Sequence, residues 1–128
     1  MSLNVLIVDD SSVTRRMIGR ALAMSGLDLG GVLEAGNGVE ALTILNGQWV
    51  DLAVVDVNMP EMNGEELIGH IRSQPAIAQL PIVVVSTEGS ETRIARLRAM
   101  GADFVRKPFQ PAELRSAVLR LLGEEDDE

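Results

Sequence analysis

The chain has 128 residues, 46% of them hydrophobic, which is enough to bury one core without disulfide or metal support. It contains no cysteine, which excludes disulfides and thiolate metal sites and agrees with a reducing compartment. No secretory signal pattern precedes the first apolar run, and runs such as residues 82–85 are too short to cross a bilayer. We therefore expect a cytoplasmic protein with no membrane association.

The formal net charge of -8 is concentrated at the C-terminus, where residues 124–128 are all acidic. The first 123 residues carry 14 acidic and 11 basic side chains, a net charge of -3. We expect one domain over residues 1–123, followed by an acidic, disordered tail or linker at 124–128. Because the sequence has no basic stripe that would follow a phosphate backbone, we expect no direct nucleic-acid binding.

Strands and helices are predicted to alternate along the chain. β-branched, apolar runs predict strands, and apolar residues at helical spacing between capping residues predict helices. In chain order these are a strand at 4–8, a helix from Ser11 or Ser12 to about 24, a strand at 32–35, a helix at 39–45, a strand at 52–55, a helix at 65–72, a strand at 82–85, a helix at 91–100, a strand at 104–106 and a helix at 111–122.

Five strands alternating with five helices through short loops predict an α/β fold. Right-handed βαβ units give a doubly wound, five-stranded parallel sheet with helices on both faces. In such a sheet, ligands bind beyond the carboxyl ends of the strands.

Polar and charged residues follow four of the predicted strands: Asp9 and Asp10, Asp56, Ser86 and Thr87, and Lys107. Carboxylates brought together at one sheet edge resist ionisation unless a cation neutralises them, and Mg²⁺ suits a site built from few carboxylates. An alternative for Asp9 and Asp10 alone is that they cap the following helix.

Lys107 is the only lysine among eleven basic residues. A lone lysine is usually a solvated surface residue, but an ammonium is a compact point charge that arginine does not replace. Beside Asp56 and Ser86, Lys107 suits phosphoryl transfer, in which a carboxylate is the nucleophile and the protein supplies alignment and charge.

Four motifs occur in order at these strand ends: residues 8–11 (VDDS), 56–64 (DVNMPEMNG), 83–88 (VVVSTE) and 104–108 (FVRKP). With them, residues 4–122 resemble the receiver domains of bacterial two-component response regulators, and CheY-like single-domain chemotaxis regulators most of all. The resemblance implies the flavodoxin-like strand order 2-1-3-4-5. Two departures stand out, because relatives commonly have threonine at the position of Ser86 and alanine at the position of Thr87.

The resemblance implies that Asp56 accepts a phosphoryl group from the phosphohistidine of a sensor histidine kinase. It implies Mg²⁺ as the cofactor, with Asp10 and Asp56 as ligands, Asp9 acting largely through water, and the backbone carbonyl of Asn58 completing the protein ligands.

The remaining roles also follow from the resemblance. Ser86 binds the phosphoryl group and moves toward it, Lys107 pairs with its oxygens, and Lys107-Pro108 is a cis peptide. Phe104 rotates and reports the state of the site on the face formed by the fourth helix, fifth strand and fifth helix. Residues 58, 87 and 88 (Asn58, Thr87 and Glu88) tune the lifetime of the phosphoryl group.

The resemblance therefore implies a signalling switch, not an enzyme in the usual sense, although it catalyses its own phosphorylation and dephosphorylation. The output partner is a flagellar motor switch or another protein target, and the chain is a monomer or a weak, phosphorylation-dependent dimer. Alternatives are a receiver excised from a longer regulator or an aspartyl-phosphate phosphatase. A phosphatase of the haloacid dehalogenase type usually has a second aspartate where Asn58 stands.

Three residues receive structural interpretations from the sequence alone. His70 is expected at the surface and Trp49 in a packing position, and base rates alone favour ordinary core packing for Phe104.

Overall fold

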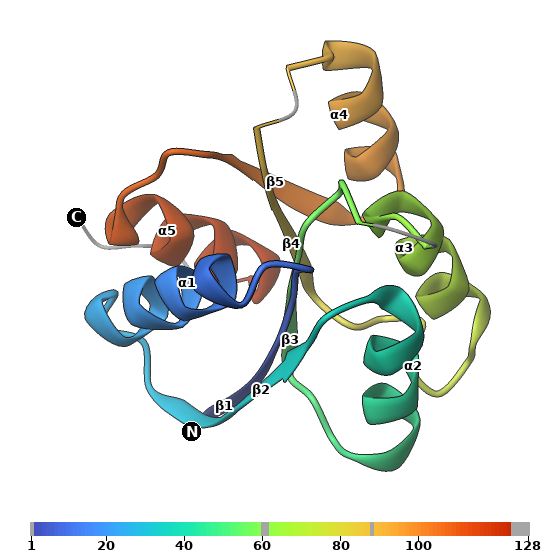
Figure 1. Ribbon diagram of the computed structural model, residues 1–128, viewed down its shortest axis with the longest axis horizontal. Coiled ribbons are helices and arrows are strands. Elements are labelled where there is room, and N and C mark those ends of the chain that lie inside the picture. Colours follow the sequence, from blue (N-terminus) through green and yellow to red (C-terminus); the bar gives the residue numbers. More distant parts are fainter. Residues whose placement is uncertain (1, 60–61, 88, 124–128) are drawn as a thin grey trace.

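The computed structural model describes residues 2–59, 62–87 and 89–123, which form five strands and five helices in alternation (Figure 1). The elements are β1 (Leu3–Val8), α1 (Ser12–Met24), β2 (Leu29–Ala35), α2 (Gly38–Gly47), β3 (Leu52–Val55), α3 (Gly64–Ser73), β4 (Ile82–Ser86), α4 (Glu91–Ala99), β5 (Ala102–Arg106) and α5 (Pro111–Leu121). The expected acidic tail at 124–128 lies outside the described residues.

The sheet is parallel throughout and has the order β2-β1-β3-β4-β5. The chain first moves outward from β1 to β2 and then returns past β1 to β3, so the strand order reverses between β1 and β3. This reversal is the point at which doubly wound sheets bind their ligands. The predicted fold class and strand order are confirmed.

Helices cover both faces of the sheet, with α1 and α5 on one face and α2, α3 and α4 on the other (Figure 1). Alternate residues of β1 point to the two faces: Leu6 and Val8 pack with α2, α3 and α4, and Val5 and Ile7 pack with α1 and α5. The sheet is therefore buried on both sides, which explains why its central strands read as continuous apolar runs.

Helix starts follow local side-chain chemistry. The side chains of Ser11, Asn37, Asn63 and Ser90 each accept a hydrogen bond from a backbone N–H in the first turn of the helix that follows. Of the two candidate caps for α1, the structure thus selects Ser11. Proline stands at the start of α5, where its missing N–H costs nothing.

Two strands begin two or more residues earlier than the sequence predicts. β2 begins at Leu29 because its backbone pairs with β1 from Leu3 onward, and the N–H of Gly31 donates to Oδ1 of Asn4 at 2.9 Å. β5 begins at Ala102, which pairs with Ile82. These extensions depend on a neighbouring strand and have no apolar run of their own to reveal them.

The apolar stripe of α1 is narrower than its spacing suggests. Ile18 and Leu22 are buried against the sheet and α5, whereas Val13, Met17 and Met24 are exposed. Within the described part of the chain, every helix is too short or too polar to serve as a membrane span.

Candidate functional site

The carboxyl edge of the sheet brings two buried aspartates together. Asp9 follows β1 and Asp56 follows β3, and the two strands are in register at Val8 and Val55. The backbone N–H of Asp56 donates to the carbonyl of Val8 at 2.9 Å, which extends the pairing by one residue. Asp9 is 2% exposed and Asp56 is 7% exposed, so both carboxyl groups are largely removed from water.

Asp10 joins these two residues from the exposed side. One carboxylate oxygen from each of Asp9, Asp10 and Asp56 lies within 4.8 Å of the others, the only such group of potential metal ligands among the described residues. Oxygen-only donors at this spacing match what a hard cation requires. The predicted convergence of the three acids is confirmed.

One oxygen of Asp9 strengthens the case for a cation. Oδ1 accepts a hydrogen bond from the N–H of Ser11 at 2.9 Å, whereas the buried Oδ2 accepts none from any residue that the structure describes and has only an ion-pair contact, with the Lys107 ammonium at 3.5 Å. A buried carboxylate oxygen without a donor is costly. Because Ser11 supplies the cap of α1, helix capping does not account for Asp9, and the acidic cluster can hold a metal ion.

Lys107 faces the buried aspartates from β5. Its Nζ lies 3.5 Å from Oδ2 of Asp9 and 4.0 Å from Oδ1 of Asp56. The backbone N–H of Lys107 donates to the carbonyl of Ser86 at 2.9 Å, and the Lys107-Pro108 peptide is cis, as the resemblance implies. The lone lysine is thus directed into the acidic cluster.

The protonation of Asp56 reflects this crowding. Burial, followed by the negative charges of Asp9 and Asp10, raises the pKa of the Asp56 carboxyl above its ordinary value. The Lys107 ammonium and a hydrogen bond from the backbone of Asn58 act in the opposite direction and lower the pKa. The Lys107 ammonium and the Asn58 backbone therefore favour the ionised form of Asp56, which is the nucleophilic form.

The other predicted site residues lie around this cluster. Ser86 is buried at the end of β4, whereas Asn58 and Thr87 are exposed at the same edge. Phe104 is buried in the core cluster with Ile94 of α4, and Glu88 lies outside the described residues.

Gly64 was not singled out from the sequence, although it closes the loop that follows Asp56. Its N–H donates to the carbonyl of Val57 at 2.9 Å. A Cβ at this position would collide with the carbonyl oxygen of Asp56 and would lie 2.8 Å from Cα of Val57. The signal in the sequence is a glycine at the first position of a helix, directly after the capping Asn63.

Arg15 is a second residue that sequence reasoning missed. Its Nη1 donates to the backbone carbonyl of Asp9 at 2.6 Å, while its Nε pairs with Glu34 at 2.7 Å. Arg15 thereby ties the first turn of α1 to the loop that carries Asp9.

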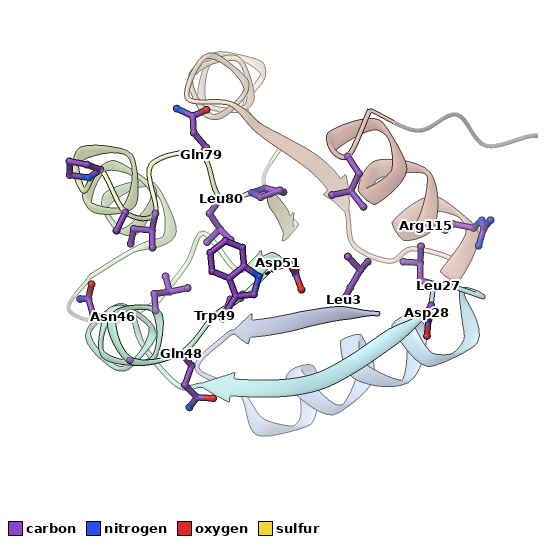
Figure 2. Close-up of a pocket in the computed structure, with 18 of the residues that line it drawn as sticks. Leu3, Leu27, Asp28, Asn46, Gln48, Trp49, Asp51, Gln79, Leu80 and Arg115 are labelled. Atoms are coloured by element: carbon purple, nitrogen blue, oxygen red, sulfur yellow. Dashed lines mark hydrogen bonds between the residues drawn. The ribbon is translucent and has the colours of Figure 1, made fainter. Parts of the chain in front are cut away.

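A groove of about 1030 Å³ lies at the other end of the sheet, around the first residue of β1 and the segments that precede β2, β3 and β4 (Figure 2). Trp49 lines it, and the prediction that Trp49 is a packing residue is wrong: the side chain is 76% exposed. Its indole Nε1 donates to Oδ1 of Asp51 at 2.7 Å, which holds the ring at the surface. His70 is exposed, as predicted.

A doubly wound sheet with acidic groups, a hydroxyl and a lysine at its carboxyl edge has the features of a phosphate-accepting signalling domain. Residues 5–119 match the family model of the response regulator receiver domain. The chain belongs to this family and is the receiver domain of a two-component response regulator, a signalling switch.

Relatives of the chain include proteins named as chemotaxis proteins. The chain is 40% identical over 123 residues to a chemotaxis protein CheY homolog of Campylobacter jejuni, covering 94% of this chain and 93% of the relative. It is 37% identical over 126 residues to chemotaxis protein CheY1 of Helicobacter pylori, covering 97% and 100%.

Solved structures of response regulators superpose on this chain. CheY4 of Vibrio cholerae superposes with a TM-score of 0.82 at 34% identity, covering 94% of this chain and 99% of that one. A putative response regulator of Chloroflexus aurantiacus superposes with a TM-score of 0.86 at 30% identity, covering 97% and 100%. The resemblance seen in the four motifs is confirmed.

Proposed function

We propose that Asp56 accepts a phosphoryl group from the phosphohistidine of a sensor histidine kinase, and that the phosphorylated domain controls a partner protein through the face formed by α4, β5 and α5. The observation that supports this most is the position of Asp56: a buried carboxylate with Lys107 Nζ 4.0 Å away and two further aspartates beside it. Membership of the receiver family supports the same proposal.

In the transfer step, a carboxylate oxygen of Asp56 forms a bond to phosphorus as the bond between phosphorus and the histidine nitrogen breaks. The electron pair of the broken bond stays with the imidazole, and a proton from solvent keeps the ring neutral. Charge develops on the equatorial phosphoryl oxygens, where the Lys107 ammonium and the Ser86 hydroxyl stabilise it.

The acidic cluster is the proposed Mg²⁺ site. Its ligands would be Asp10, Asp56 and the backbone carbonyl of Asn58, with Asp9 acting largely through water, and the convergence of three carboxylate oxygens within 4.8 Å supports the presence of a cation. Bound Mg²⁺ would supply positive charge that offsets both the carboxylates and the phosphoryl oxygens.

The domain would also catalyse the loss of its own phosphoryl group. Asn58 and Thr87 are exposed at the carboxyl edge of the sheet, where Asp56 lies, and the sequence motif that contains Thr87 adds Glu88 to them. These three residues are the proposed determinants of signal lifetime.

The relatives named as chemotaxis proteins support chemotaxis as the setting. The proposed output target is then a flagellar motor switch protein, with the cytoplasm as the compartment in which kinase and regulator meet. The chain would act as a monomer or as a weak dimer formed on phosphorylation.

Intact-protein mass spectrometry after exposure to acetyl phosphate and Mg²⁺ tests the acceptor. A phosphoryl adduct in the parent that is absent from Asp56→Asn supports Asp56 as the acceptor. The proposal is wrong if the parent acquires no adduct, or if Asp56→Asn acquires one to the same extent.

A further inference from the structure

Helix α4 is attached to α3 at two places of very different character. Figure 1 shows α4 at the edge of the layer formed by α2, α3 and α4, beside α3. One attachment lies at the C-terminal end of α4 and involves backbone carbonyls, and the other lies near its middle and involves charged side chains.

The attachment at the end of α4 is made by Arg72 in the last turn of α3. Its guanidinium donates to the carbonyls of Met100 at 2.8 Å, Ala78 at 2.9 Å, Leu80 at 2.7 Å and Gly101 at 3.4 Å. These carbonyls belong to the α4–β5 turn and to the segment that enters β4. We call Arg72 with these carbonyls the α4 pivot.

The attachment near the middle is made by Glu65 in the first turn of α3. Its Oε1 lies 3.6 Å from Nε of Arg93, and its Oε2 lies 3.4 Å from Nε of Arg96. One carboxylate thus pairs with two arginines that lie one turn apart on α4. We call Glu65, Arg93 and Arg96 the α4 latch.

The pivot is the stronger of the two attachments. The partly buried guanidinium of Arg72 donates charge-assisted hydrogen bonds to several backbone carbonyls, and such bonds are stronger than those between neutral groups. The latch is weaker for two reasons: on its Arg96 side 56% of the arginine side chain is accessible, and exposed ion pairs contribute little, while on its Arg93 side the arginine is 24% exposed and its Nε lies 3.6 Å from Glu65 without a hydrogen bond. The apolar side chains of α4 are also less completely buried farther from the pivot: Leu97 is fully buried, whereas Ile94 is 8% exposed.

The latch also lies between the phosphoacceptor and α4. Glu65 directly follows Gly64, which packs against the carbonyl of Asp56. On the other side, the short loop from Ser86 to Ser90 joins the buried hydroxyl to the N-cap of α4. Movement of Ser86 toward a phosphoryl group would therefore pull on the end of α4 that lies farthest from the Arg72 pivot.

We propose that Glu65 is a positioning residue whose pairing with Arg93 and Arg96 holds α4 in its resting position, and that on phosphorylation α4 swings about the Arg72 pivot as the latch opens. This inference rests on the proposed function, because it assigns a mechanism to that switch. Opening the latch by mutation shifts the resting equilibrium toward the activated position of α4.

The test opens the latch from both sides with opposite changes of charge. Glu65→Gln removes a negative charge, and the double variant Arg93→Gln/Arg96→Gln removes two positive charges. Backbone amide NMR shifts of α4 are measured without ligand and with beryllofluoride and Mg²⁺, and the rate of Asp56 phosphorylation by acetyl phosphate is measured in parallel. Glu66→Gln is the matched control, because it makes the same charge change one residue away and glutamine still serves its capping box.

Both latch variants are expected to move the unliganded α4 amides toward their activated positions and to raise the phosphorylation rate about 2- to 5-fold. If the variants acted only through long-range electrostatics on the anionic acetyl phosphate, their effects would be opposite. Phosphorylation of Asp56 would then be faster in Glu65→Gln and slower in the double variant. In the parent, beryllofluoride should shift the amides of the first turn of α4 much more than those of Met100 and Gly101.

The inference is overturned if Glu65→Gln behaves like Glu66→Gln, if the two latch variants change the rate in opposite directions, or if Met100 and Gly101 shift as much as the first turn. A parent that responds to neither beryllofluoride nor acetyl phosphate would instead contradict the proposed function itself. The two failures are thereby distinguished.

Discussion

At the scale of single residues, the site depends on where one point charge lies among acidic groups. Lys107 Nζ approaches Asp9 to 3.5 Å and Asp56 to 4.0 Å, so one ammonium faces two buried carboxylates. Ten of the eleven basic residues are arginine. The planar guanidinium of arginine directs its donors differently from the ammonium of lysine and occupies more space. The chemistry of the ammonium, more than its rarity, explains why lysine stands here.

We expect Lys107→Arg to lower the phosphorylation rate of Asp56 by acetyl phosphate about tenfold, because loss of a well-placed charge at a transition state is costly. The adduct is followed by intact-protein mass spectrometry over time. Arg106→Lys is the control, since Arg106 is exposed beside it and should retain the parent rate. Full activity in Lys107→Arg would refute the argument for a point charge.

At the scale of elements, the start of α3 connects local helix chemistry with the site. Asn63 and Glu66 form a reciprocal capping box, and Gly64 at the first position of α3 lets the helix approach the carbonyl of Asp56. The capping box is visible in the sequence. The close approach is not, because it depends on how the loop after β3 folds back.

Gly64→Ala should destabilise the domain by about 2 to 4 kcal/mol, because the added methyl group collides with backbone atoms that have no room to move. Urea unfolding followed by circular dichroism measures the change. In the control Gly47→Ala, the new Cβ meets no heavy atom of the described residues within 4 Å, so stability should change by less than about 0.5 kcal/mol. Equal effects at the two positions would contradict the steric account.

At the scale of the whole molecule, the fold concentrates negative charge at one edge of the sheet at a cost in stability. Asp9 and Asp56 are buried, and burial is the main cause that raises the pKa of Asp56. A native state that binds a proton more readily than the unfolded chain loses stability as pH rises from the unfolded pKa through the folded one. The ionised site is therefore a source of instability at neutral pH, which ligands can relieve.

Asp56→Asn should raise the melting temperature at pH 7, without divalent cations, by about 2 to 6 °C, since the amide removes the buried charge. The gain over the parent should shrink as the pH falls through the raised pKa of Asp56, because the parent carboxyl then becomes protonated. Thermal unfolding in EDTA between pH 4 and pH 8 measures this. A gain that does not depend on pH would show that the raised pKa is not its cause.

Mg²⁺ should stabilise the parent, by about 1.4 kcal/mol when its concentration is ten times the Kd, because binding to the native state alone shifts the unfolding equilibrium. Removing the metal with EDTA should reverse the gain, and Asp10→Asn should largely abolish it. Melting temperature against Mg²⁺ concentration is the measurement. An Asp10→Asn variant that gains as much as the parent would exclude Asp10 as a ligand.

The sequence by itself determined the order of elements, the parallel arrangement of the sheet and the acidic and basic residues at the strand ends. It could do so because apolar periodicity and capping are local, and because the carboxyl ends of parallel strands must share one edge. Only the tertiary structure decided which side chains meet across long separations, such as Arg72 with Met100 and Glu65 with Arg96, or that Trp49 lies exposed. These contacts depend on how helices pack on the finished sheet, and neither propensity nor spacing encodes that packing.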